Sequence, residues 1–212
     1  MEQLQNVNLY RIVHRDNMAY ILQKGMFCSG HPFFDPDNIF IGDSTLTQQR
    51  HDFILPLAAK GNLGDYIPFY FSYRSPMLYN IHTGHRGIKQ RPQSDIVYIV
   101  CKLQPLIDKG FECIFSDGHA KNKVTRFFTD TKDLSQLDWE SIKALQWNNT
   151  PTNPDRMRRK QAECLIKSQV PPQYIAALVV FDEATKTAME ALISTNKLTI
   201  GVHINPKNEF YY

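Results

Sequence analysis

The stretch from Gly64 to Gly84 constrains the fold more than any other part of the chain. It places six aromatic residues within GDYIPFYFSYRSPMLYNIHTG, and its pattern changes in the middle. The apolar and aromatic residues over 67–71 predict a short strand, whereas Ser75-Pro76 predicts the start of a helix, with the serine as N-cap and the proline as first helical residue. Arg74 is therefore expected at a rigid turn between a strand and a helix.

Length and composition set the outer bounds. The chain has 212 residues, of which 42% are hydrophobic and 12% aromatic, so it can bury one sizeable core, and we expect one domain over residues 1–212. Its four cysteines lack the CxxC spacing of metal sites, which predicts no metal. No secretory or transit segment precedes Leu9 and no apolar run is long enough to cross a membrane, so we expect a cytoplasmic protein without membrane contact.

The charge distribution is more informative than the net charge. The chain carries 24 Lys and Arg against 21 Asp and Glu, a net charge of +3, which is too mild to indicate nucleic-acid binding by itself. The basic residues nevertheless gather in three clusters, over 86–91, 121–126 and 156–160. Such clusters attract phosphates even where acidic helices cancel the total, and solvated basic surfaces are the alternative explanation for each of them.

Hydrophobic periodicity predicts alternating strands and helices. Strands are expected over 9–13, 67–71, 96–103, 113–115, 164–166, 175–181, 198–204 and 210–212. Helices are expected from an N-cap at Asp16 to Gln23, over 45–51, in two segments between 121 and 145, and over 183–195. The residues over 148–155 exclude regular structure, and the long connection over 29–64 is typical of a functional segment. Because strands and helices mix without strict βαβ alternation, the fold class is α+β.

Glu163 is the most conspicuous candidate for chemistry. The chain has no P-loop, no GxGxxG after a strand, no GxSxG and no HExxH, so those reaction classes are excluded. Glu163 lies in the apolar run AECLI and, in a strand, shares a face with Gln161 and Leu165. A buried carboxylate is costly unless it has a partner. The alternative is an edge glutamate paired with Arg158 or Lys160.

Four separated segments make the chain recognisable. These are LYRIVHRDN at 9–17, DYIPFYFSYRSPMLYNIHTG at 65–84, CIFSDGHA at 113–120 and RKQAECLI at 159–166. Together, and in this order, they resemble the DarT family of DNA ADP-ribosyltransferase toxins over nearly the whole chain. The resemblance implies an ADP-ribosyltransferase-like fold, with a split mixed β-sheet core flanked by helices.

The resemblance also implies a catalytic pair and a substrate, NAD. A glutamate that begins a core strand holds the 2′-hydroxyl of the nicotinamide ribose in ADP-ribosyltransferases, and Glu163 matches that position. There it would stabilise positive charge as the nicotinamide bond breaks. Arg50 matches an arginine that the family uses in catalysis, and its guanidinium can clamp phosphates and the acceptor base. The loop over 147–160, which precedes Glu163, would recognise the acceptor of the ADP-ribose.

Further residues are assigned by the same resemblance. The NAD-binding residues expected on the first strand and in the segment after it are Arg11, Ile12, Val13, Tyr20 and Cys28. The expected DNA-binding residues are Arg74, His119, Arg158 and Arg159. The tyrosines and phenylalanines around Arg74 can stack on bases of a single strand, although burial in the core is the alternative for each ring.

The sequence therefore predicts an enzyme that uses NAD to transfer ADP-ribose to thymine in single-stranded DNA. The resemblance makes it the toxin of a toxin–antitoxin pair, with a macrodomain antitoxin that removes the modification. Two alternatives stay open at this point: transfer to RNA, and a single-stranded nucleic-acid-binding module without catalytic activity.

Overall fold

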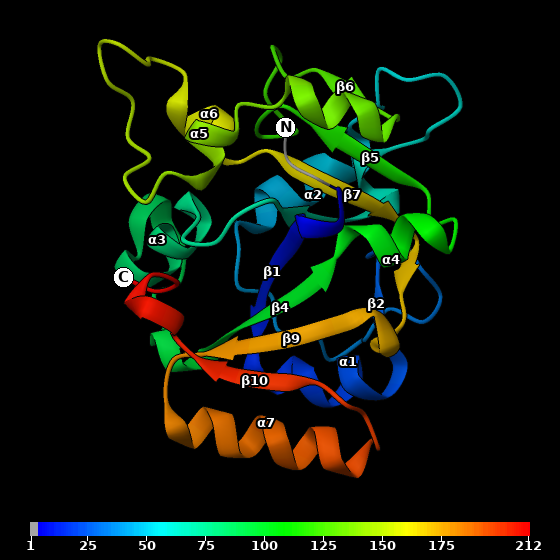
Figure 1. Cartoon of the computed structure of the whole chain (residues 1–212), viewed down its shortest axis with the longest axis vertical. Helices are drawn as coiled ribbons and strands as arrows, with labels where there is room; N and C mark the ends of the chain where they lie inside the picture. Colours follow the sequence, from blue (N-terminus) through cyan, green and yellow to red (C-terminus); the bar gives the residue numbers. More distant parts are fainter. Residues whose placement is uncertain (1–3) are drawn as a thin grey trace.

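A mixed β-sheet runs through the protein, and helices cover it (Figure 1). The computed structural model describes residues 4–212. The strands, in the order in which they lie side by side, are β10 (Gly201–Ile204), β9 (Ile175–Val180), β4 (Ile96–Lys102), β1 (Asn8–His14), β3 (Tyr66–Tyr70), β7 (Glu163–Lys167), β5 (Cys113–Ser116) and β6 (Phe127–Phe128). β10 and β9 are parallel and the other neighbours are antiparallel, so the sheet is mixed. A second, small sheet joins β2 (Met26–Phe27) to β8 (Gln169–Val170).

The sheet splits between β1 and β3. β1 pairs with β4 along its whole length, whereas its only register pair with β3 is Tyr10 and Tyr70. Beyond that pair the Arg11 guanidinium donates to the Pro68 carbonyl at 2.9 Å. Proline has no N–H to offer a neighbouring strand, so Pro68 weakens the ladder here. The two diverging strands leave room for a cavity.

Within residues 4–212, seven α-helices accompany the sheet. They are α1 (Met18–Lys24), α2 (Ser44–Asp52), α3 (Pro76–Thr83), α4 (Leu103–Asp108), α5 (Trp139–Lys143), α6 (Arg156–Lys160) and α7 (Glu183–Thr195). α3 begins as expected: the Ser75 hydroxyl accepts a hydrogen bond from the Leu78 amide, and Pro76 is the first helical residue. Gly84 ends this helix with φ 71°, a left-handed conformation that favours glycine. The predicted bounds of α7 are confirmed.

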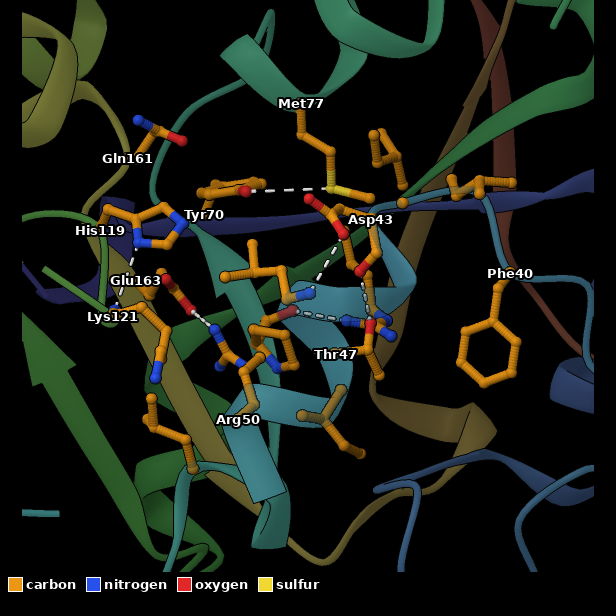
Figure 2. A pocket seen from close by; sticks show the side chains of 18 of the residues that line it. Phe40, Asp43, Thr47, Arg50, Tyr70, Met77, His119, Lys121, Gln161 and Glu163 are labelled. Atoms are coloured by element: carbon orange, nitrogen blue, oxygen red, sulfur yellow. Dashed lines mark hydrogen bonds and ion pairs between the residues drawn. The ribbon is translucent and has the colours of Figure 1, made fainter. Parts of the chain in front are cut away.

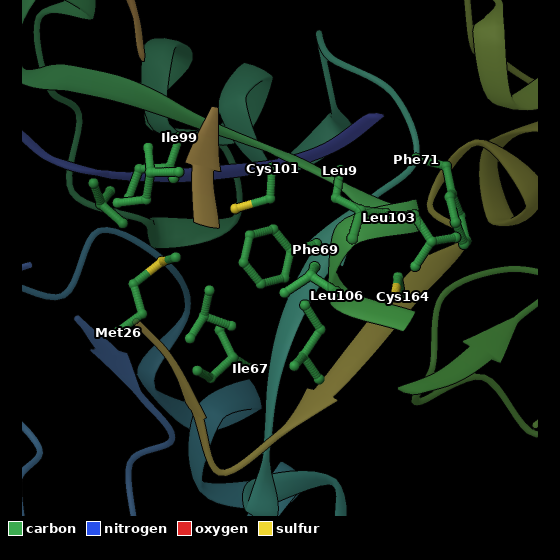
Figure 3. Packing of buried hydrophobic residues seen from close by; sticks show 14 of the residues in the cluster. Leu9, Met26, Ile67, Phe69, Phe71, Ile99, Cys101, Leu103, Leu106 and Cys164 are labelled. Atoms are coloured by element: carbon green, nitrogen blue, oxygen red, sulfur yellow. The ribbon is translucent and has the colours of Figure 1, made fainter. Parts of the chain in front are cut away.

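The main cluster of buried hydrophobic residues lies on one face of the central strands (Figure 3), and smaller clusters pack elsewhere on the sheet. Phe69 of β3 is 1% exposed and packs in one cluster with residues of β1, β4 and β7. Cys164 and Ile166 enter this core, whereas Leu165 packs on the opposite face. This alternation confirms the predicted faces of the strand that begins at Glu163.

Two predicted elements differ from the structure, and a third is confirmed. Asp16 is not an N-cap, because the chain forms a 3₁₀ turn over Arg15–Asn17 in which the Asp16 amide donates to His14 Nδ1. The first predicted helical segment after 121 is wrong: the Asp117 carboxylate binds the Arg126 amide and turns the chain into β6. The second segment is confirmed as α5, with Asp138 as N-cap.

The remaining differences concern short segments. Residues 210–212 do not form the predicted strand, because the side-chain amide of Gln93 takes the backbone hydrogen bonds of Tyr212. The basic residues over 156–160 form α6, which the preceding Asn-Pro-rich loop concealed in the sequence pattern. Within the described residues, no helix is both long and apolar enough to cross a membrane.

Candidate active site

A cavity of about 650 Å³ opens where β1 and β3 diverge. Its walls come from these two strands, from α2 and the segment before it, and from the turn after β5, which carries His119. Figure 2 shows Glu163 and Arg50 facing one another in this cavity, with Tyr70 and His119 close by. The size and mixed lining are typical of a pocket for a small-molecule ligand.

Glu163 and Arg50 form a buried ion pair that is only partly satisfied. Glu163 Oε1 accepts a hydrogen bond from the Ala120 amide at 2.9 Å, and Oε2 lies 3.1 Å from Arg50 Nη1. Oε2 and Arg50 Nη2 are both buried and, among the described residues, have no hydrogen-bond partner. Within the described chain, Oε2 therefore has only the ion-pair contact with Arg50, and Nη2 has no partner. Because buried polar atoms are normally hydrogen-bonded, these two atoms indicate that a ligand completes the site.

Local hydrogen bonds position both members of the pair. Asp43 caps α2 by accepting from the Leu46 amide, and Arg50 projects from the last turn of this helix. The Glu163 amide donates to Ser116 Oγ at 3.0 Å, and this hydroxyl donates to the Gly118 carbonyl at 2.7 Å. Ser116 thus joins the start of β7 to the turn that carries His119.

His119 is held as a neutral hydrogen-bond donor. Burial lowers its pKa, outweighing the nearby Glu163 charge. Its Nδ1 accepts from the Lys121 amide at 3.2 Å, so the neutral ring carries its proton on Nε2. The preceding Gly118 packs tightly, since a Cβ there would lie 2.9 Å from the Arg158 carbonyl oxygen. A larger residue would displace the turn from the cavity.

Arg11 and Tyr70 complete the polar floor. Loss of hydration and the neighbouring Arg50 charge lower the pKa of Arg11 to about 10, so Arg11 stays charged at neutral pH. Burial and the Glu163 charge raise the pKa of Tyr70, which therefore stays protonated. Tyr70 was not among the predicted site residues, although its register opposite Glu163 places it there. Its hydroxyl lies 3.9 Å from the Met77 sulfur.

Eight of the predicted site residues line the cavity and three do not. Those that line it are Arg11, Ile12, Val13, Cys28, Arg50, His119, Arg158 and Glu163. The other three are Tyr20, Arg74 and Arg159. Tyr20 lies outside the lining and donates its hydroxyl to the Phe33 carbonyl at 2.7 Å. The Arg74 guanidinium lies 4.8 Å from the centre of the Tyr212 ring.

Carboxylates surround the basic end of the 147–160 loop. Arg158 pairs with Asp117 at 2.8 Å and with Asp155 at 2.7 Å, and Arg159 pairs with Asp138 at 2.9 Å and Asp155 at 3.1 Å. Hydrogen bonds from Arg158 and Arg159 lower the pKa of Asp155. The loop therefore offers much less positive charge than its sequence indicates.

Two other basic residues of the lining have no carboxylate partner in the part of the chain that the structure describes, although Lys121 Nζ donates to the Gln49 carbonyl at 3.3 Å and lies 4.9 Å from the centre of the Phe53 ring. Among the described residues, no carboxylate lies within 4.0 Å of Arg86 or Lys121, which line the cavity from the segment after α3 and from the turn after β5. Arg86 is exposed and has a left-handed backbone, with φ 57°. Both belong to basic clusters that the sequence showed, but no local pattern distinguished them from the paired arginines.

The sequence of this chain is similar to proteins of one known family. The family model described as "DarT: ssDNA thymidine ADP-ribosyltransferase, DarT" matches residues 10–212. The chain belongs to the DarT family. A DNA ADP-ribosyl transferase from Escherichia coli O127:H6 (strain E2348/69 / EPEC) is 36% identical over 200 residues, which cover 94% of this chain and 91% of that protein. This membership confirms the family predicted from the sequence segments.

Solved structures confirm the fold. DarT of Thermus sp. 2.9 in complex with ADP-ribosylated ssDNA matches with a TM-score of 0.88 and 29% identity, over 97% of this chain and 96% of that one. The same protein in complex with NAD+ matches with a TM-score of 0.79 and 28% identity, over 97% and 98%. A DNA ADP-ribosyl transferase–DNA ADP-ribosyl glycohydrolase fusion protein of Thermosipho africanus is 26% identical over 91% of this chain and 47% of the fusion.

The donor set of the site does not resemble a metal centre. Within residues 4–212, no group of three or more His, Cys, Asp or Glu side chains is arranged to hold a metal ion. All four cysteines are free thiols.

Proposed function

We propose that the protein uses NAD to transfer ADP-ribose to thymine in single-stranded DNA, as one ADP-ribosyltransferase domain over residues 1–212. The observation that carries the proposal is the buried Arg50–Glu163 pair, with one free polar atom on each partner. Membership of the DarT family and the Thermus complexes with NAD+ and with ADP-ribosylated ssDNA supply the chemistry that such a pair would perform.

The residues present fit NAD. Glu163 Oε2 is a free acceptor for a ribose hydroxyl, and Arg50 Nη2 is a free donor for a phosphate or carbonyl oxygen. Arg11, which stays charged, adds a second cation on β1, next to the backbone of Ile12 and Val13. Cys28 lines the same wall. When bound, NAD supplies an activated ribose whose leaving group, nicotinamide, departs as a neutral molecule.

The side chains of the chain have distinct roles in the transfer. The carboxylate of Glu163 stabilises the positive charge that develops on the ribose when the bond to nicotinamide breaks and the electron pair leaves with nicotinamide. A ring nitrogen of thymine then forms the new glycosidic bond, and its proton passes to water. Arg50 stabilises the negative charge on the base, and the Nε2–H of neutral His119 can donate to a thymine carbonyl oxygen.

A single strand is the expected acceptor, because pairing and stacking in a duplex hide the ring nitrogen of thymine. The target base has to reach the cavity floor while the sugar–phosphate backbone stays at the mouth. There Arg86 and Lys121 offer charges that no carboxylate of the described chain neutralises. We therefore assign the phosphate contacts to these two residues rather than to Arg158 and Arg159, whose charges are already paired.

We further propose that the protein acts in the cytoplasm as the toxin of a toxin–antitoxin pair. A modified template base blocks replication, and the Thermosipho fusion relative carries, by its name, a glycohydrolase activity beside the transferase. A separate macrodomain that removes ADP-ribose from DNA is the corresponding antitoxin. Expression of the parental gene should arrest growth, whereas expression of Glu163→Gln should be tolerated.

Mass spectrometry of short oligonucleotides tests the activity directly. The purified protein is incubated with NAD and with matched DNA and RNA strands that contain one thymine or one uracil. The proposal expects one added ADP-ribose on the DNA strand, and none when thymine is replaced by cytosine or when NAD is omitted. Modification of the RNA strand alone would establish the RNA alternative, and the absence of both modification and nicotinamide release would establish the non-catalytic one.

A further inference from the structure

A cluster of aromatic side chains lies beside the cavity and has no role in the chemistry above. It comprises Tyr79 of α3, Trp147 at the start of the loop, and Tyr212. Tyr79 meets the other two rings edge to face, with centroids 5.7 Å from Trp147 and 5.3 Å from Tyr212. Figure 1 shows the last residues of the chain beside α3. Segments far apart in the sequence thus build one surface.

The cluster is anchored from below. Trp147 Nε1 donates to Tyr212 Oη at 2.7 Å, and Tyr212 Oη lies 3.2 Å from the carbonyl oxygens of both Arg74 and Ser75. The Tyr212 amide donates to Gln93 Oε1 at 2.6 Å, which fixes its backbone. The hydroxyl and the amide of Tyr212 are therefore both engaged, and its ring serves as a support.

The other two rings remain accessible. Tyr79 is 38% exposed and Trp147 is half-buried. Asn80, next to Tyr79, and Asn149, two residues after Trp147, line the cavity, so the cluster begins where the cavity ends. Each edge-to-face contact covers one face of only one of its two rings, so it does not use up the ring faces of both partners. Large aromatic faces held at the surface are the usual platforms for bases of single-stranded nucleic acid.

We propose that Tyr79 and Trp147 stack on the base next to the target thymine and thereby set the preference for the flanking sequence. This inference rests on the proposed function and adds a second point of contact for the strand. The Arg74 guanidinium lies 4.8 Å from the centre of the Tyr212 ring. In this proposal Arg74 positions Tyr212 and does not touch DNA. Sequence preference then comes from differences in stacking strength.

Fluorescence tests the stacking without depending on activity. The chain has two tryptophans, so Trp139→Phe leaves Trp147 as the only source of tryptophan fluorescence. Titration with a single strand that lacks thymine, in the absence of NAD, should quench this emission in a saturable way. If Trp139→Phe fails to fold, the difference between the parental protein and Trp147→Phe gives the same signal. Unchanged emission with bound oligonucleotide would overturn the proposal.

Kinetics with an abasic flank separates stacking from a purely structural clasp. Removal of the flanking base should raise the KM for DNA about tenfold in the parental protein, because one base–aromatic stack contributes about 1–3 kcal/mol. In Trp147→Ala the KM should already be raised, and removal of the base should change it little further. Trp147→Phe keeps a stacking face, so it should retain most of the discrimination despite losing the bond to Tyr212.

Failure of the stacking proposal and failure of the proposed function give different results in these experiments. If the parental protein does not modify thymine strands, the proposed function is wrong whatever the fluorescence shows. If it modifies them, but Trp147→Ala still discriminates the abasic flank as strongly as the parental protein, the cluster only holds the loop and the stacking proposal is wrong.

Discussion

Two groups of arginines and carboxylates lie within the same part of the molecule and differ in how completely they are paired. Around α6, Arg158 and Arg159 share Asp117, Asp138 and Asp155, with N–O distances of 2.7–3.1 Å. In the cavity, Arg50 has one carboxylate partner, Glu163, and each of the two keeps a buried atom without a hydrogen bond. Both groups combine arginines with carboxylates, but within the described residues only the cavity pair has a buried atom without a hydrogen bond on each partner.

The difference distinguishes structural ion pairs from functional ones. In the closed network carboxylates already compensate both arginines, so little charge is left for a ligand, and removal of one partner would leave an uncompensated charge. An open pair accepts an energetic cost in the free protein, which a ligand with a hydroxyl and a phosphate can offset. On this basis we assign the α6 network to holding the loop in place, and we propose that the cavity pair performs the chemistry.

The largest effect is expected from breaking the open pair. Glu163→Gln should lower the transfer rate by at least about a hundredfold, because the amide cannot oppose the charge on the ribose. Its thermal stability should stay near the parental value, since the amide oxygen can still accept from the Ala120 amide. Activity is followed by nicotinamide release and stability by calorimetry.

The matched variant in the closed network is Asp117→Asn. It should show the opposite profile, with a loss of about 3 kcal/mol in the free energy of unfolding and a smaller loss of activity. If both variants changed activity and stability in the same proportion, the distinction between open and closed pairs would be wrong.

Arg50→Lys gives the next largest effect. Lysine keeps the charge but loses the planar fork, so one contact to Glu163 and one to the ligand cannot form together. We expect turnover to fall by about a hundredfold, the value of one or two charged hydrogen bonds. Arg159→Lys, in the half-exposed part of the closed network, is the control and should keep most of the activity. If Arg50→Lys turned over at the parental rate, the guanidinium of Arg50 would not be needed for catalysis.

Salt dependence sharpens the comparison for DNA binding. Arg86→Ala should flatten the plot of log affinity against log salt by about 0.7, the value for one phosphate contact on a single strand. Arg158→Ala should leave the slope unchanged and lower thermal stability instead, because its charge is engaged by Asp117 and Asp155. Oligonucleotide binding by anisotropy at several salt concentrations measures both. A flatter slope for Arg158→Ala would restore its predicted contact with the backbone of DNA.

The smallest effect concerns Lys160, the third basic residue of α6. It is 1% exposed and bonds to the Ile142 carbonyl and Ser72 Oγ, and burial lowers its pKa to about 7. Between pH 7 and the ordinary lysine pKa the unfolded chain binds a proton that the folded chain lacks, so the free energy of unfolding should rise with pH. The difference between the parental protein and Lys160→Met, measured by urea unfolding at pH 7 and 9, isolates this contribution. A difference independent of pH would show that Lys160 stays charged.

Much of the fold followed from local patterns. The turn from β3 to α3 was predictable because Ser75 and Pro76 fix a helix start by short-range chemistry. The strand at Glu163 was predictable because its apolar alternation is local as well. The segment after 121 was not predictable, since the Asp117 carboxylate reaches across nine residues to turn the chain.

In the candidate site, too, some features were predictable from the sequence and others were not. Glu163 and Arg50 were identifiable in the sequence through their segments and the family resemblance, and α2 and β7 then bring them within 3.1 Å. The pairing of Arg158 and Arg159 was not, because beside the local Asp155 it depends on Asp117 and Asp138, which lie 41 and 21 residues away along the chain. A basic run looks the same in a sequence whether its charges are free or paired.

The sequence by itself determined the family, the α+β class, the start of α3 and the identity of the central glutamate, because each depends on residue type and short spacing. Only the tertiary structure decided where the sheet splits, which arginines keep their charge available and which aromatic rings meet at the surface. These properties depend on burial and on partners distant in the chain, and burial is what turns a charge or a ring into a site.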